Sequence, residues 1–357
     1  MRRARSPLIL PGPTRLATIG RGQARAVLAV LVLVLLLLGA LPAADPAPDL
    51  TRQIGFHGAI VDRLRHGGED YYTATAAALR GSDLPTRPFT AFPLPALATI
   101  AGQLSAISLL GLMAPLIGLV AAAWSRHFAR PGPGRSLCFT VALAAAFGVM
   151  QSGNDLLPQL WAGLFIALSL ALRRPGRWLE SAAIGLAAAI VYEGAALYLA
   201  IMALAAWHDD HRREAAIWGG ALLATLAVVA VHARAATDAV GTMDATTGWA
   251  SAGPLAALDA LLTTSGLRVL PSGVAAPLFA IALAGWCAWR DPLAVRAAAT
   301  VIACLVLLAF LPGTAVTTGA LVAPLVLLGL LPAIDGIRDL LRAALDSRRI
   351  TVTRVVR

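Results

Sequence analysis

The chain has 357 residues, of which 58% are hydrophobic and 13% are charged, with a mean hydropathy of +0.75. Soluble domains carry about 25% charged residues, so this composition excludes an ordinary soluble domain and predicts an integral membrane protein made of helices. The net charge is +10, and all 29 basic residues are arginine. They are scattered over short segments between hydrophobic stretches, so nucleic acid is not an expected partner. Two interpretations of the arginines stay open: phosphate-bearing partners, and coding bias combined with topology signals.

Both ends of the chain are basic. Residues 1–25 precede an apolar run, Ala26–Ala44, which is the predicted first span. A basic segment before a first span places the N-terminus in the cytoplasm. We expect this span to be retained, because Leu41–Ala44 is a poor cleavage site, with a cleaved signal peptide as the alternative. The basic tail, residues 335–357, is also expected in the cytoplasm, and its portion Ile334–Leu345 has the pattern of an amphipathic interfacial helix.

Residues 26–334 are predicted to form an all-α, polytopic bundle of about ten spans. The stretch Leu179–Trp207 is unusual because arginines flank both of its ends. Arginines mark cytoplasmic segments, so both ends are predicted to face the cytoplasm. As one helix it would be about 43 Å long, enough for one crossing and too short for two. We therefore predict two short, non-spanning helices that meet near Tyr192-Glu193-Gly194, with one long helix as the alternative. The other spans are predicted at Leu94–Trp124, Leu137–Met150, Leu156–Leu172, Ala215–Val231, Gly273–Trp289, Ala297–Pro312 and Gly319–Ile334.

A polar segment, residues 45–92, is predicted to be the first extracytoplasmic loop and to contain short helices, and Ala233–Ser272 is predicted to be a second outer segment. Glu69 and Asp70 precede an Ala-rich helical run, Thr73–Arg80, so they would lie in the first turn of a helix, where carboxylates are favourable. They either cap that helix or act as a general base on a sugar hydroxyl. The first loop also carries five arginines, an outer excess that a phosphate at the membrane surface would explain.

Three further features carry candidate chemistry. Arg87 lies near the predicted interface, where it either meets a lipid phosphate or extends its charged end to water. Glu193 lies deep in the apolar profile, where an acid marks a functional site by default. It would position an acceptor, pair with a loop arginine or relay protons, and the alternative is a structural pair.

His208–His211 has the composition of a metal cluster, but the adjacent arginines favour a solvated turn. No P-loop, HExxH or dinucleotide motif is present, and we predict no cofactor; a divalent metal has no support in the sequence.

Several stretches together resemble a known family. Glu69-Asp70-Tyr71-Tyr72, followed by Ala76–Gly81 and by Pro88–Pro95 before a hydrophobic span, resembles the first lumenal loop of GT-C glycosyltransferases, above all the bacterial members that use polyprenyl-phosphate sugars. Gln151–Asn154 resembles a short outer turn of these enzymes, and Gly185–Trp207 resembles their short non-spanning helix pair. The resemblance covers about residues 26–230.

The resemblance implies an inverting transferase of the bacterial inner membrane. Such an enzyme moves a sugar from a polyprenyl-phosphate donor to an envelope glycan, lipid or protein acceptor on the extracytoplasmic face. It implies Asp70 as the catalytic base, with Glu69 beside it and with Asp49 nearest to the place where many members carry the acid. The runner-up is a non-enzymatic membrane protein, either a transporter or flippase or a glycan-assembly factor. The expected substrate-binding residues are Arg63, Arg65, Arg87, Tyr71, Tyr72, Gln151, Asn154 and Glu193.

Overall fold

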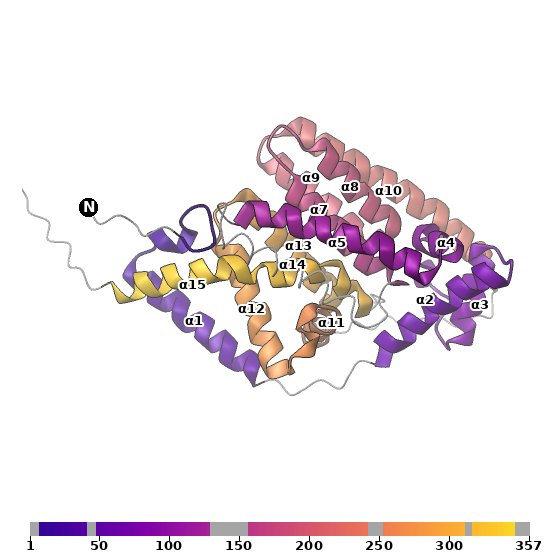
Figure 1. Cartoon of the computed structure of the whole chain (residues 1–357), viewed down its shortest axis with the longest axis horizontal. Coiled ribbons are helices and arrows are strands. Elements are labelled where there is room, and N and C mark those ends of the chain that lie inside the picture. The colour runs from indigo at the N-terminus through magenta and orange to yellow at the C-terminus, as the bar shows by residue number, and fades with distance from the viewer. Residues whose placement is uncertain (1–6, 41–47, 129–155, 242–252, 311–315, 347–357) are drawn as a thin grey trace, which may run out of the picture.

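The computed structural model describes residues 7–40, 48–128, 156–241, 253–310 and 316–346 (Figure 1). Within these ranges every regular element is a helix, apart from an isolated bridge between Arg174 and Arg177, so the predicted all-α class is confirmed. The α-helices are α1 (Arg21–Gly39), α2 (Pro48–His66), α3 (Tyr71–Gly81), α4 (Pro95–Gln103), α5 (Ala106–Phe128), α7 (Pro158–Leu172), α8 (Leu179–Val191), α9 (Ala196–His208), α10 (Arg212–Asp238), α11 (Pro254–Thr264), α12 (Ser272–Ala288), α13 (Pro292–Phe310), α14 (Ala323–Leu328) and α15 (Leu330–Leu345). The 3-10 helices are η1 (Arg15–Thr18), η2 (Phe89–Ala91), η4 (Glu193–Ala195), η5 (Gly266–Val269) and η6 (Val316–Leu321).

Four of the described helices, α1, α5, α10 and α13, are long and apolar enough to cross a membrane. Large apolar side chains such as Val30, Leu33 and Leu36 lie exposed along α1, an arrangement that suits contact with hydrocarbon. These features indicate a membrane protein. The helices α7, α8, α9, α11 and α12 are apolar but shorter, so the predicted total of about ten spans stays a prediction.

The stretch Leu179–Trp207 is broken at the place that the charge pattern indicates. α8 ends at Val191, Tyr192 has an extended backbone (φ −148°, ψ 122°), and η4 leads into α9. α8 packs against α7 and α10, and α9 packs along α10 (Figure 1). A helix of 13 residues is about 20 Å long, which is shorter than the hydrocarbon core of about 30 Å. The predicted break of this stretch into two short helices is therefore confirmed.

The predicted second span, Leu94–Trp124, is wrong as a single helix. The chain leaves the helical conformation at Leu104 (φ −107°, ψ 148°), and the hydroxyl of Ser105 accepts a hydrogen bond from the N–H of Ser108 at the start of α5. The short α4 packs on α2, so it belongs with the helices of the polar loop. The apolar stretch continues through this break without a change in hydropathy. The hydropathy pattern therefore does not show where α4 ends.

The predicted span Gly319–Ile334 is also wrong, because η6, α14 and the start of α15 occupy it. At Gly329 the backbone approaches α12 so closely that a Cβ atom added to Gly285 would overlap the Gly329 carbonyl oxygen. In the described part of the predicted outer segment Ala233–Ser272, α10 continues to Asp238 and the largely buried α11 follows, and its outer location stays a prediction. The predicted span Leu137–Met150 lies outside the described residues.

The segment before α1, residues 7–19, docks on α15, and we call it the N-terminal strap. The N–H groups of Leu8, Ile9 and Leu10 donate to the carboxylate of Asp335 at 2.7, 2.8 and 2.8 Å. The Asp335 side chain is buried, so these three donors replace the water that a carboxylate otherwise requires. The strap is therefore fixed to the last described helix by charge-assisted hydrogen bonds.

Two further contacts hold the strap. The hydroxyl of Thr14 donates to Asp339 at 2.8 Å, and the guanidinium of Arg290 donates to the Thr14 carbonyl at 3.1 Å. The predicted interfacial helix Ile334–Leu345 thus begins earlier, at Leu330, and protein covers its inner face. The strap and the C-terminal end of α15 lie at one end of the molecule, and α2 and α3 lie at the other end (Figure 1).

Candidate functional site

Asp70 is the N-cap residue of α3. Its carboxylate accepts hydrogen bonds from the N–H groups of Tyr72 and Thr73 at 3.0 and 3.1 Å and from the Thr73 hydroxyl at 2.6 Å. The Thr73 hydroxyl, followed by these N–H groups, holds the pKa of Asp70 below its usual range. The side chain is exposed. Asp70 therefore caps the helix, which was one of the two alternatives, and its role as a base stays a prediction.

The other charged side chains of the polar loop have separate partners. Glu69 pairs with Arg63 at 3.2 Å, and the second carboxylate oxygen of Glu69 is buried without a hydrogen-bond partner in the described part of the chain. Arg65 donates to three carbonyl groups at the C-terminal end of α4. Arg87 donates to the carbonyl of Gly241, just beyond α10, at 2.6 Å. These three arginines each secure a different part of the fold, so their predicted contact with a donor phosphate stays a prediction.

Tyr71 and Tyr72 connect α3 to the rest of the molecule. Tyr71 is buried and donates its hydroxyl hydrogen to the Pro93 carbonyl. The Tyr72 hydroxyl lies 3.2 Å from Nδ1 of His232 on α10, and Nε2 of His232 lies 3.0 Å from the Phe92 carbonyl. A carbonyl can only accept, so Nε2 carries the hydrogen and the neutral ring accepts from Tyr72 at Nδ1. This chain of hydrogen bonds fixes α3 against the end of α10.

Glu193 lies at the break between α8 and α9. One of its carboxylate oxygens is shielded from solvent and has no hydrogen-bond partner among the residues that the structure describes. Burial raises the pKa of Tyr71, and the negative charge of Glu193 raises it further. Glu193 therefore lies within electrostatic range of the first-loop Tyr71, although the two residues are far apart in the sequence. Asp70, in contrast, is exposed at the start of α3.

Further polar side chains surround the break. The Tyr192 hydroxyl lies 2.8 Å from Oγ1 of Thr318, and the side chain of Gln159 also hydrogen-bonds to it. The Thr317 hydroxyl donates to Oε1 of Gln53 on α2 at 2.6 Å. The oxygen of the Gln159 side chain is buried and has no partner in the described ranges. We call the following residues the buried polar cluster: Gln53, Gln159, Tyr192, Glu193, Thr317 and Thr318.

The sequence interpretation missed most of this cluster. Gln159 stands out as a lone amide in an apolar run, directly after a proline that begins α7, and Thr317 and Thr318 form the only paired hydroxyls in the last apolar region of the described chain. Polar residues inside apolar stretches would therefore have been a usable signal. The contact of this threonine pair with Gln53 could not be predicted from the sequence, because the two threonines lie more than 260 residues further along the chain.

Two acceptors of the cluster, the Gln159 amide oxygen and one Glu193 oxygen, have no donor in the part of the chain that the structure describes. A buried acceptor without a donor costs about 1–3 kcal/mol. Hydroxyl groups of a ligand would supply the missing hydrogens, and a carboxylate held in this way also accepts a proton during a reaction. The arrangement therefore suits a ligand that carries several hydroxyl groups.

His57 lies one turn after Gln53 on the buried face of α2, and burial lowers its pKa to about 4. The unfolded chain titrates near 6.5, so between pH 6.5 and 4 it binds a proton that the folded chain excludes. We expect the free energy of unfolding, which is at its full value above pH 6.5, to fall by about 3 kcal/mol as the pH drops to 4. Chemical unfolding in detergent at several pH values in this range measures the slope of the unfolding free energy against pH.

The matched variants for this prediction are His57→Gln and His66→Gln, because His66 is an exposed histidine on the same helix. The His57 variant is expected to lose most of the slope, and the His66 variant is expected to keep it. An unchanged slope in the His57 variant contradicts the prediction.

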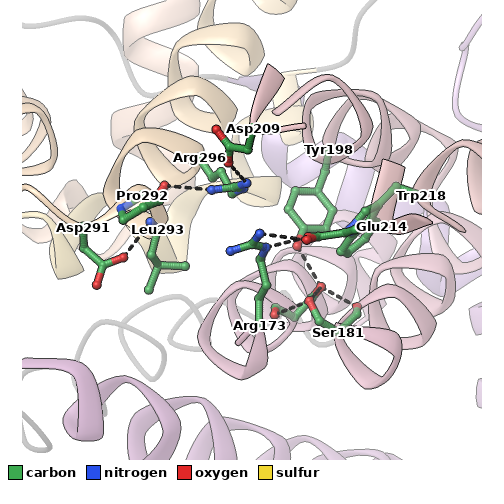
Figure 2. Close-up of polar contacts among 11 residues, drawn as sticks. Arg173, Ser181, Tyr198, Asp209, Glu214, Trp218, Asp291, Pro292, Leu293 and Arg296 are labelled. Carbon is green, nitrogen blue, oxygen red and sulfur yellow. Dashed lines mark hydrogen bonds and ion pairs between the residues drawn. The ribbon is translucent and has the colours of Figure 1, made fainter. Parts of the chain in front are cut away.

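A second polar group lies where α7, α9, α10 and α13 meet (Figure 2). Arg173 donates to both carboxylate oxygens of Glu214 at 2.7 and 2.9 Å, and Nε1 of Trp218 donates to the same carboxylate. Arg296, whose side chain is 2% exposed, donates to Asp209 at 2.6 Å. We call Arg173, Glu214, Arg296 and Asp209 the ion-pair network.

The turn His208–His211 is largely solvated, as expected, and its Asp209, whose side chain is 37% exposed, also joins the ion-pair network. No group of histidine, cysteine and acidic side chains with the arrangement of a metal site occurs within the described ranges. Beside the network, the Ser169 hydroxyl lies 2.7 Å from the Tyr198 hydroxyl and donates to the Ser181 carbonyl at 2.6 Å (Figure 2). These contacts lock the ends of α7, α8 and α9 together.

Three predicted site residues, Asp49, Gln151 and Asn154, belong to none of these groups. Asp49 lies in the first turn of α2, while Gln151 and Asn154 lie outside the described residues.

No protein-family model, no curated protein and no solved structure matches this chain. Its function is therefore argued from the geometry of its own residues.

Proposed function

We propose that this protein is a membrane glycosyltransferase that moves a sugar from a polyprenyl-phosphate donor to an envelope glycan, lipid or protein acceptor. The reaction takes place on the extracytoplasmic face of the bacterial inner membrane, with both termini in the cytoplasm. The observation that carries the proposal is the buried polar cluster next to α2 of the polar loop, where the Gln159 and Glu193 oxygens have no donor among the described residues. Sugar hydroxyls are donors of the required kind.

Glu193 supplies the base in this proposal. A carboxylate held within reach of an acceptor hydroxyl removes its proton as the new glycosidic bond forms and the lipid phosphate leaves. An acid among apolar helices, at a break in a helix pair, is costly to maintain and marks such a site. Asp70 is the assignment that the family resemblance implies, but as an exposed cap with a lowered pKa it is the weaker base. Its cap fixes the start of α3, and so positions Tyr71 and Tyr72.

The test is sugar transfer by purified protein in vesicles, using a panel of polyprenyl-phosphate sugars. Glu193→Gln keeps the size of the side chain and removes the base, so we expect transfer to fall by about 10²–10⁴-fold. The matched control is Glu180→Gln, because Glu180 is an exposed acid on α8 and the variant should keep the wild-type rate.

Asp70→Asn separates the two assignments. A small loss in this variant together with a large loss in the Glu193 variant supports the proposed base, and the reverse pattern assigns the role to Asp70. Wild-type rates in both variants contradict carboxylate catalysis by this protein. Translocation of a labelled solute or lipid without any sugar transfer would identify the runner-up, a transporter.

A further inference from the structure

A cavity of about 160 Å³ lies between α1, α12 and α15, beside the N-terminal strap. No charged, amide or hydroxyl side chain lines it. The lining includes Leu16 of the strap, Val27 and Leu31 of α1, Cys287 of α12, and Ile337 and Leu340 of α15. An apolar cavity of this size accepts hydrocarbon groups.

The cavity adjoins the part of the molecule that faces lipid. α1 is one of the four candidate spans, and only 6% of its most apolar window is buried. Val27 is 42% exposed, and Cys287 is exposed as well, so the cavity communicates with the surface along α1. A hydrocarbon chain from the bilayer therefore has direct access to it.

Two arginines lie at the level where the headgroup of such a lipid would be. Arg15 precedes Leu16 and is within electrostatic range of the Cys287 thiol, and Arg21 is the first residue of α1. Both side chains are exposed, and neither forms an ion pair with any described residue. From Arg21 to Leu31 the helix rises about 15 Å, which is half the thickness of the hydrocarbon core. Arg21 thus lies before the apolar lining, which extends from there along α1.

The nearby acids do not cancel these charges. Asp335 is buried against three N–H groups of the strap, and Asp339 accepts from Thr14. Cationic sites beside grooves between helices are typical binding places for anionic phospholipids. We propose that this cavity holds part of one acyl chain of an anionic diacyl phospholipid, whose phosphate is bound by Arg15 and Arg21.

The test uses the full-length protein reconstituted in vesicles of equal parts phosphatidylglycerol and phosphatidylcholine, then extracted in mild detergent. Native mass spectrometry counts the lipids retained on each protein. We expect one retained phosphatidylglycerol, with a preference over phosphatidylcholine of about 30-fold, the ratio for two cations near an anionic headgroup. The variant Arg15→Gln/Arg21→Gln is expected to lose that preference, whereas the charge-matched Arg174→Gln/Arg177→Gln is expected to keep it.

A second variant tests the chain slot independently of charge. Val27→Trp fills the cavity from an exposed position, so both lipids should be lost while the melting temperature is retained. In the unmodified protein, Cys287 should react with a maleimide more slowly in phosphatidylglycerol than in phosphatidylcholine vesicles. Equal retention of the two lipids, an unchanged preference in the Arg15/Arg21 variant, or a lipid-free dimer as the species detected would each overturn the proposal. The sugar-transfer experiment can fail without affecting this one.

Discussion

The variant Arg173→Ala is expected to lower the free energy of unfolding by about 3–5 kcal/mol. The Arg173 and Glu214 side chains are 8% and 2% exposed and are joined by two parallel hydrogen bonds. Removing the guanidinium leaves the Glu214 carboxylate buried, with the Trp218 N–H as its one remaining side-chain partner among the described residues. The cost is that of an uncompensated buried charge. Unfolding by a denaturing detergent, followed by circular dichroism, measures it.

The neighbouring turn provides the control. Arg177 pairs with Glu180, but these side chains are 73% and 58% exposed, so Arg177→Ala should cost less than about 1 kcal/mol. The double variant Arg173→Met/Glu214→Leu removes both charges together and is expected to recover most of the lost stability. Equal losses for Arg173→Ala and Arg177→Ala would show that the buried pair contributes no more than an exposed one.

The variant Gly285→Ala is expected to destabilise the protein by about 3 kcal/mol. A Cβ atom there would overlap the Gly329 carbonyl oxygen and would lie 2.7 Å from the N atom of Ala333. These obstacles are backbone atoms, so no rotation of a side chain relieves them. α12 and α15 would have to separate, and the loss would appear as a lower melting temperature in detergent.

The matched control for this prediction is Gly118→Ala on α5, where an added Cβ would meet nothing within 4 Å. Alanine favours helix over glycine by about 1 kcal/mol, so this control should be neutral or stabilising. The two identical substitutions therefore have opposite expected signs. A stabilising effect of Gly285→Ala would contradict the close contact between α12 and α15.

The part of the fold that follows from the sequence is the part with local signals. The break at Tyr192 follows from arginines at both ends of a stretch that is too short for two crossings. The cap at Asp70 follows from two glycines before an acid and an Ala-rich run. In each case the determining residues lie within a few turns of the feature.

The rest depends on contacts between distant residues. The partner of Arg173 lies 41 residues away and that of Arg296 lies 87 residues away, and no spacing rule connects them. The cluster around Glu193 takes members from α2, α7 and η6, so its existence becomes visible only when those helices are packed. For the same reason, the sequence interpretation favoured the local candidate, Asp70, over Glu193.

The docking of the N-terminal strap has a consequence for biosynthesis. The N–H of Leu10 binds a carboxylate 325 residues further along the chain. At about 5–20 residues per second, a ribosome needs roughly 15–65 s to reach that aspartate after making the strap. Throughout that interval the N–H groups of the strap bind water instead of Asp335. The strap can dock on α15 only after Asp335 has been made, so this contact forms late in synthesis.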